Sequence, residues 1–256
     1  MTGVVLTEVR RTIGVLTLNR PKVRNALNLE LREAMQRALE DFDGNPRVTV
    51  VVLTGAGGNF CSGRDLKAAA AGEPRYANRQ AQQAAFTRTS IRKPVIAAVE
   101  GYALAGGFEL ALSCDLIVAA RDATFGLPEV KRNLVAIGGG LIRLPQRMPY
   151  HLAMHLALTG DHVAAEHVAT WGIVSRLAES GNALTEALTL AESIARNGPS
   201  AVRATKEIMH RAFEWGSEDD AFDAQLAAAE PALSSPDRNE GIQAFLERRD
   251  PIWSDR

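Results

Sequence analysis

The sequence predicts an α/β fold in which a layered, largely parallel sheet is followed by a helical C-terminal region. Residues 48–53 are almost continuously β-branched, as expected of a strand that is buried on both faces. Residues 95–99 and 116–119 repeat this pattern, with helical signals at 77–91 before the first and at 106–112 between the two. Alternation of strand and helix favours parallel pairing, because parallel strands need a crossover connection.

The N-terminal elements are also readable from the pattern. Residues 4–9 and 13–18 are predicted strands, and Asn19-Arg20-Pro21 ends the second one. A helix is predicted over 28–43, with Asn28 as its N-cap. Its apolar face would be formed by Leu31, Met35, Ala38, Leu39 and Phe42.

Beyond about residue 140 the chain changes character. Residues 141–245 are helical almost throughout, with glycine- and proline-containing interruptions and one possible short strand within 171–176. The last sixty or so residues therefore look like a helical appendage to the α/β core. Such segments commonly pack against another subunit.

Composition limits the class of protein. The chain has 256 residues, 46% hydrophobic and 23% charged, with a net charge of −1, which predicts neither nucleic acid nor a membrane surface as a partner. No apolar run approaches the roughly 20 residues that span a bilayer, and residues 1–11 do not resemble a signal peptide. We therefore expect a cytoplasmic protein, with Cys61 and Cys114 as reduced thiols.

A turn after the strand at 48–53 is the first segment that could carry chemistry. Residues 58–67 read GNFCSGRDLK, and the small residues Ser62 and Gly63 would let main-chain N–H groups approach a ligand closely. Asp65 is placed to cap the next helix. Taken alone, the segment is more typical of an ordinary strand-to-helix turn.

Two further segments each contain a glutamate. Gly106 would begin a helix, and Glu109 follows about one turn later among apolar neighbours. A carboxylate buried there is costly unless it is paired or functional, although Glu109 at the polar edge of the helix is the alternative. Pro128 suits the first position of a short helix, so Glu129 would lie in its first turn, where an acid also matches the helix dipole.

Other motif-like features do not point to a different chemistry. His151 and His155 are spaced like zinc ligands on a helix, but the glutamate of the metalloprotease motif is missing between them. Gly57-Gly58 matches neither a dinucleotide fingerprint nor a P-loop. No metal site is predicted.

In combination, these segments resemble the crotonase superfamily, the family of enoyl-CoA hydratases and isomerases. The matching pieces are Asn19-Arg20-Pro21-Lys22 with Asn25-Ala26-Leu27, then 60–66, 101–115, and 125–129 with the later glycines. They occur in family order and at family spacing, and the resemblance extends to the tail at 244–253.

The resemblance implies a spiral of ββα units with a helical C-terminal trimerisation region. It places the acyl-CoA-binding and catalytic core at residues 1–195 and the helical oligomerisation region at 196–256, in a homotrimer or a dimer of trimers. It also implies that the N–H groups of Ser62 and Gly106 form the oxyanion hole, and that Glu109 and Glu129 are the catalytic acids. No cofactor is implied, because coenzyme A is part of the substrate.

Residues that would contact coenzyme A also follow from the resemblance. They comprise two early cations, the segment beside the oxyanion turn, and two tail positions that would reach the coenzyme A of a neighbouring subunit: Lys22, Arg24, Arg64, Asp65, Leu66, Lys67, Phe245 and Arg248. A solvated surface charge is the alternative for each cation. Ala105 and residues 133–137 depart from the family pattern. In the family the segment at 133–137 lines the acyl end of the pocket, so its departure indicates an unusual acyl specificity.

The reaction implied is the addition of water across the C2–C3 double bond of a trans-2-enoyl-CoA, as in fatty acid metabolism. A double-bond isomerase needs only one proton-shuttling carboxylate, so the presence of both glutamates favours the hydratase. A carnitinyl-CoA-type dehydratase or another reaction of the family remains an alternative. A non-catalytic acyl-CoA-binding protein is a further alternative, which the two retained acids argue against.

Overall fold

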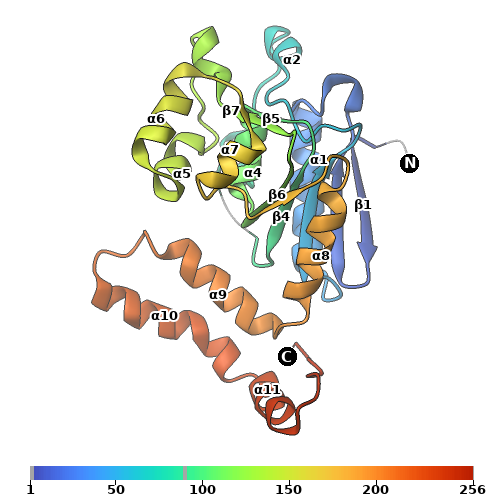
Figure 1. Cartoon of the computed structure of the whole chain (residues 1–256), viewed down its shortest axis with the longest axis vertical. Helices are drawn as coiled ribbons and strands as arrows, with labels where there is room; N and C mark the ends of the chain where they lie inside the picture. The colour runs from blue at the N-terminus through green and yellow to red at the C-terminus, as the bar shows by residue number, and fades with distance from the viewer. Residues whose placement is uncertain (1–2, 89–90, 256) are drawn as a thin grey trace.

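The core of the computed structural model, which describes residues 3–88 and 91–255, is a six-stranded sheet (Figure 1). Its strand order is β1-β2-β3-β4-β6-β9; β1 runs antiparallel to β2, and all the other neighbours are parallel. The strands are β1 (Val5–Arg10), β2 (Ile13–Leu18), β3 (Val50–Gly55), β4 (Val95–Val99), β6 (Leu116–Ala120) and β9 (Arg176–Ala178). The predicted parallel core is thus confirmed.

Burial explains why the central strands are the easiest to read from the sequence. All five residues of β4 are buried, as are Val50–Leu53 within β3, because helices and loops cover both faces of these strands. The edge strand β1 has polar and half-exposed residues instead. The helix α8 packs across β2, β3, β4, β6 and β9 and supplies apolar cover from Ala183, Ala187 and Ala191.

A second, three-stranded sheet positions the site, and the sequence did not predict it. It contains β5 (Tyr102–Leu104), β7 (Thr124–Gly126) and β8 (Val163–Ala164), in the order β5-β7-β8. The turn after β3 joins it, because Cys61 pairs with Ala103 of β5. This pairing brings the turn at 58–67 beside the turn that begins at residue 105.

The helices follow the capping signals of the sequence. Asn28 caps α1 by accepting the N–H of Leu31 at 3.0 Å, and the predicted apolar face is buried. Asp65 caps α2 by accepting the N–H groups of Lys67 and Ala68. The helices and 3-10 turns are η1 (Pro21–Val23), α1 (Leu29–Gly44), α2 (Leu66–Ala70), α3 (Arg79–Ala84), α4 (Gly106–Ser113), η2 (Pro128–Arg132), α5 (Gly140–Arg147), α6 (Tyr150–Thr159), α7 (Ala165–Thr170), α8 (Ala183–Ala195), α9 (Pro199–Arg211), α10 (Glu218–Leu233) and α11 (Pro236–Glu247).

Two predicted elements are wrong in extent. The helix predicted over 77–91 is limited to α3, because Ala85 adopts an extended ψ of 137° and Phe86 donates its N–H to Gln36 of α1. Residues 89 and 90 of that prediction lie outside the described residues. The strand expected within 171–176 begins only at Arg176, after a turn at Gly172, where φ is +86°.

The last three helices form an arm below the sheet in Figure 1. Helix α9 packs against α10, and Lys206 ties α9 to the core through an ion pair with Asp115 at 2.8 Å. Large apolar side chains are exposed along the arm, namely Met209, Phe213, Phe222, Leu226, Ile242, Phe245 and Leu246. The division at residue 195 stays a prediction. No helix within residues 3–88 and 91–255 has the length and apolar character needed to cross a membrane.

Candidate active site

Two glycine-containing turns meet at the end of the sheet, as the sequence motifs predicted. A Cβ added to Gly63 would lie 2.6 Å from the Cβ of Ala105 and 3.1 Å from the nitrogen of Gly106. A Cβ added to Gly107 would lie 2.1 Å from the carbonyl oxygen of Cys61. Only glycine at these positions lets the two backbones approach so closely.

The free N–H groups at this junction belong to Arg64 and Gly106. Gly106 is the first residue of α4, where an N–H has no partner within the helix. Neither N–H finds an acceptor in the described part of the chain. A Cβ on Gly106 would lie 3.8 Å from the nitrogen of Arg64, so the two donors are neighbours that can bind one oxygen atom.

The expectation that Ser62 supplies one of these donors is wrong. Its N–H donates to the carbonyl oxygen of Arg24 at 3.0 Å, and its hydroxyl donates to that of Val23. The N–H of Ser62 is therefore committed to holding η1 against the turn. Arg64, two residues later and directly before the cap Asp65, presents the free amide instead.

Glu109 is buried in α4, with 1% of the residue exposed. Its Oε1 accepts the N–H groups of Gly138 at 2.7 Å and Gly140 at 3.1 Å. Its Oε2 accepts no hydrogen bond in the described part of the chain, and lies 3.7 Å from Nη2 of Arg75. The main chain therefore anchors one carboxylate oxygen and leaves the other available to a ligand.

Glu129 lies in the first turn of η2 after Pro128, where the sequence placed it, and is half-buried. Its Oε2 is buried without a hydrogen-bond partner among the described residues. Burial is the largest influence and raises the pKa of the Glu129 carboxyl above its ordinary value; its own N–H lowers it, the Glu109 charge raises it, and Arg75 lowers it. The protonated form of Glu129 is thereby favoured relative to an exposed glutamate.

A cavity of about 570 Å³ gathers these groups. Arg64, Gly106, Glu129 and Arg75 line it, together with apolar side chains that include Leu66, Leu134 and Ile137. Glu109 is not among the residues that line this cavity, but it forms an ion pair with Arg75, which does line it. Sequence reasoning missed Arg75, because nothing in the sequence links the loop between α2 and α3 to Glu109.

A smaller, apolar cavity of about 290 Å³ shares Glu129 and Val135 with the first one. Its other lining residues come mainly from α5 and α6, and include Leu141, Leu144 and Leu158. Val135 belongs to the segment that departs from the family pattern, so this segment does lie at the site. The carboxyl of Glu129 therefore lies where the mostly hydrocarbon cavity meets the polar groups of the first cavity.

The predicted coenzyme A contacts fall into four groups, of which three lie at or near the oxyanion turn. Arg64 and Leu66 line the main cavity, whereas Asp65 caps α2 and forms an ion pair with Arg20 at 3.0 Å, which gives it a structural role. The side chains of Lys22, Arg24 and Lys67 are exposed near the same turn, with the Arg24 guanidinium over the ring of Tyr102.

Phe245 and Arg248, the predicted contacts in the tail, are remote from that turn. They lie at the end of α11, at the opposite end of the molecule from α2 in Figure 1. Within one chain they are thus separate from the cavity, and only a neighbouring copy could bring them to it. Their role stays a prediction.

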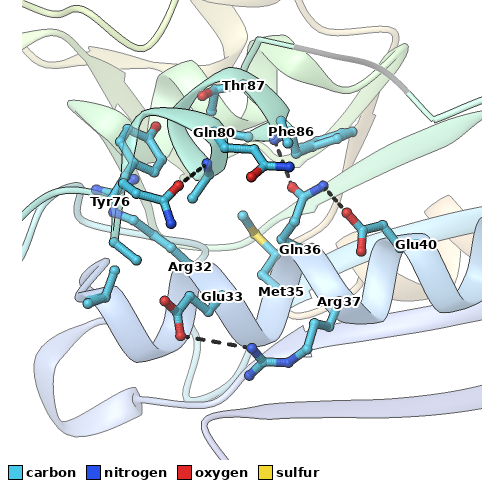
Figure 2. A pocket seen from close by; sticks show the side chains of 16 residues that line it. Arg32, Glu33, Met35, Gln36, Arg37, Glu40, Tyr76, Gln80, Phe86 and Thr87 are labelled. Carbon is cyan, nitrogen blue, oxygen red and sulfur yellow. Dashed lines mark hydrogen bonds and ion pairs between the residues drawn. The ribbon is translucent and has the colours of Figure 1, made fainter.

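A further cavity, of about 390 Å³, lies between α1 and the segment at 76–87 (Figure 2). Tyr76 lines it, and its ring lies 5.6 Å from the guanidinium carbon of Arg32. Consecutive residues thus face different cavities, with Arg75 toward the catalytic groups and Tyr76 toward Arg32. The contact with Arg32 supports the loop that carries Arg75.

Both cysteines are free, as predicted, and the structure shows them buried. Burial raises the pKa of the Cys61 thiol to about 11, so little thiolate exists near neutral pH. Cys61 is consequently a structural residue of the turn rather than a nucleophile. Within the described residues, no group of three or more histidine, cysteine or acidic side chains is placed to hold a metal ion.

Comparison with known proteins places this geometry in a family. A family model described as enoyl-CoA hydratase/isomerase matches residues 8–256. The chain belongs to this family. Among solved structures, an enoyl-CoA hydratase of this family from Mycobacterium tuberculosis H37Rv is 51% identical, with a TM-score of 0.94 over 99% of both chains. This similarity confirms the predicted crotonase fold.

Two characterised relatives in the enoyl-CoA hydratase/isomerase family show a range of acyl groups. The mevalonyl-coenzyme A hydratase sidH of Aspergillus fumigatus is 38% identical over 94% of this chain and 91% of its own length. A carnitinyl-CoA dehydratase of Salmonella enteritidis is 40% identical over 94% of both chains. Both names describe the addition or removal of water on a coenzyme A thioester.

Proposed function

We propose that the protein is an enoyl-CoA hydratase, a hydro-lyase that adds water across the C2–C3 double bond of a trans-2-enoyl-CoA. The observation that carries the proposal is the grouping of two free main-chain donors with the carboxyl of Glu129 at one cavity, to which Glu109 is joined through Arg75. Each carboxyl keeps a buried oxygen, Oε2 of Glu109 and Oε2 of Glu129, that has no hydrogen-bond partner among the described residues. The names of the relatives support the same reaction class.

The donors act on the thioester oxygen. Attack at C3 moves negative charge onto this oxygen, and the N–H groups of Arg64 and Gly106 stabilise it there. Removing one such preorganised donor typically costs about 3 to 4 kcal/mol of transition-state stabilisation. No side chain of the oxyanion turn needs to ionise for this step.

The carboxyl groups transfer the protons. Glu109, as the carboxylate, accepts a proton from water while the water oxygen bonds to C3. Glu129, whose raised pKa favours the protonated form, gives a proton to C2 as the double bond is lost. After one turnover Glu109 has gained a proton and Glu129 has lost one. Glu109 then releases its proton and Glu129 takes one up, directly or through solvent water, which restores both groups.

The site supports a hydrocarbon acyl chain as substrate. The apolar cavity beside Glu129 continues from the place where C2 and C3 would lie, and its lining is mostly aliphatic. An acyl chain that passes Glu129 would bury its methylene groups there, at about 0.8 kcal/mol each. The protein would act in the cytoplasm, in fatty acid metabolism.

A substrate screen tests the proposed reaction. We expect crotonyl-CoA and longer trans-2-enoyl-CoAs to lose their conjugated absorbance when the protein is added. The variants Glu109→Gln and Glu129→Gln should each lower kcat by at least about 100-fold. Conversion of 3-enoyl-CoAs without hydration would instead identify an isomerase, and wild-type rates in both variants would falsify the mechanism.

The arm supports assembly into a homotrimer or a homohexamer. Phe213, Phe245 and Leu246 are among its exposed apolar side chains, and burying them between copies would remove them from water. Light scattering should give a mass three or six times that of the single chain. A monomer at micromolar concentration would contradict this part of the proposal.

A further inference from the structure

The ion pair between Arg75 and Glu109 gives the two carboxyl groups of the site different surroundings. Glu109 is almost completely buried, whereas Arg75 has 21% of its side chain exposed and lines the cavity. A buried carboxylate is stable as an anion only where charge and hydrogen bonds compensate it. Two N–H groups at Oε1 and one guanidinium near Oε2 provide that compensation.

Glu129 has fewer such partners. Its Oε2 is buried and accepts no hydrogen bond within the described ranges, and no cation there lies within ion-pair distance of it. Its own N–H and the charge of Arg75 lower the pKa of Glu129, but burial outweighs them, so its charge is compensated less than that of Glu109. Two carboxyl groups whose surroundings differ in this way can act as a base and an acid in one reaction.

Arg143 is the other cation that faces Glu109, and it is engaged elsewhere. Its Nη2 donates to the carbonyl oxygen of Thr87 at 2.9 Å, and its Nη1 donates to that of Gly138 at 3.4 Å. It thus fixes the glycine turn that holds Oε1. The charged groups around Glu109 are Arg75 from the loop after α2, Glu129 from η2 and Arg143 from α5.

Arg75, in contrast, forms its one ion pair in the described part of the chain with Glu109, and its charge also lowers the pKa of Glu129 from a longer distance. Its Nε is buried and donates to nothing there. The loop that carries it is held from the other side, where Tyr76 packs against Arg32 (Figure 2). The guanidinium is consequently placed by its loop to act on Glu109.

We propose that Arg75 is a positioning residue for the hydration reaction, which holds the Glu109 carboxylate and directs its Oε2 toward the substrate water. This role rests on the hydratase function proposed above and adds a residue that acts through Glu109. Arg75 forms no bond to the substrate in this scheme. Its loss would leave Oε2 of Glu109 without its guanidinium contact and free to turn away.

Three single variants test the role with crotonyl-CoA. Arg75→Gln should lower kcat by about 10- to 100-fold, because Glu109 is still present but is no longer held in place. Its KM should change little, because Arg75 forms no bond to the substrate in this scheme. Arg75→Lys should restore most of the lost kcat. Arg79→Gln is the matched control, because Arg79 is exposed on α3 and the same charge is removed away from the cavity.

A double variant distinguishes this role from a purely structural one. Arg75→Gln should have no further effect on the residual rate of Glu109→Gln, because the group through which it acts is already neutral. Additive losses in the double variant overturn the inference. Failure of Arg75→Gln to fold also overturns it, since a residue that acts only through Glu109 is not needed for folding.

Other outcomes separate this inference from the proposed function. An active wild type together with an unchanged kcat in Arg75→Gln overturns the inference alone. A loss confined to KM does the same, and shows instead that Arg75 binds substrate. A wild type that hydrates none of the enoyl-CoAs overturns the proposed function, and this inference with it.

Discussion

Glu109 and Gly138 are in direct contact, and the contact requires glycine. The N–H of Gly138 donates to Oε1 of Glu109 at 2.7 Å, while a Cβ at position 138 would lie 2.5 Å from Oε2 of the same carboxylate. The φ of Gly138 is not in the left-handed region, so an alanine is compatible with the backbone. The carboxylate, as the flexible partner, is what would have to move.

Gly138→Ala should therefore act on catalysis more than on folding. Displacing a catalytic group by about 1 Å can cost about 100-fold in rate. We expect kcat for crotonyl-CoA to fall by that order, with a far-ultraviolet circular dichroism spectrum like that of the wild type. Gly44→Ala, at a glycine with no atom within 4 Å of an added Cβ, is the matched control and should keep the wild-type rate. Equal rates in the two variants would show that Glu109 tolerates displacement.

The oxyanion turn offers a second test, between Gly63 and Ser62. Gly63 has φ of +93°, and an added Cβ would lie 2.9 Å from the carbonyl oxygen of Leu104. Gly63→Ala should separate the donors of Arg64 and Gly106, lower kcat by at least about 100-fold, and lower the free energy of unfolding by about 1 to 3 kcal/mol. Ser62→Ala should stay within about 3-fold of the wild-type rate, because it removes only a hydroxyl that bonds to Val23. Steady-state kinetics on both folded variants would measure the two effects. A large loss of kcat in Ser62→Ala would contradict the assignment of the donor to Arg64.

The sequence predicted those parts of the fold that local pattern determines. Continuous apolar runs located β3, β4 and β6, and the cap at Asn28 located α1 with its buried face. The strands β5, β7 and β8 are three residues long or shorter, so they carry no periodicity and form only through pairing with distant segments. The end of α3 was missed for a related reason, because Gln36 of α1 captures the N–H of Phe86.

The candidate site shows the same division. Gly106, Glu109 and Glu129 lie in motifs whose local spacing is informative, and the structure brings them to one region. The choice between the N–H groups of Ser62 and Arg64 depends on a hydrogen bond to Arg24, which no local pattern encodes. Arg75 and Glu109 are far apart in the sequence, and only the folded structure brings them into contact. No local pattern could therefore predict that Arg75 belongs to the site.

The raised pKa of Glu129 predicts how stability depends on pH. A carboxyl whose pKa is higher in the folded than in the unfolded protein binds its proton more tightly in the folded state. Its stabilising contribution is therefore complete below the unfolded value, about 4.5, and is lost as the pH rises through the folded value. Above that value, the folded protein carries a partly buried charge that the unfolded chain would solvate.

Glu129→Gln removes this charge at every pH and isolates the effect. We expect its melting temperature to exceed that of the wild type at pH 8, because the amide resembles the protonated carboxyl. The difference should shrink as the pH is lowered toward about 4.5, where the wild type also becomes neutral at this position. Differential scanning calorimetry of both proteins across this range measures the gap. A gap that does not change with pH, or a wild type that is the more stable protein at pH 8, would show that burial does not raise the pKa of Glu129 and would remove the basis for treating it as the acid.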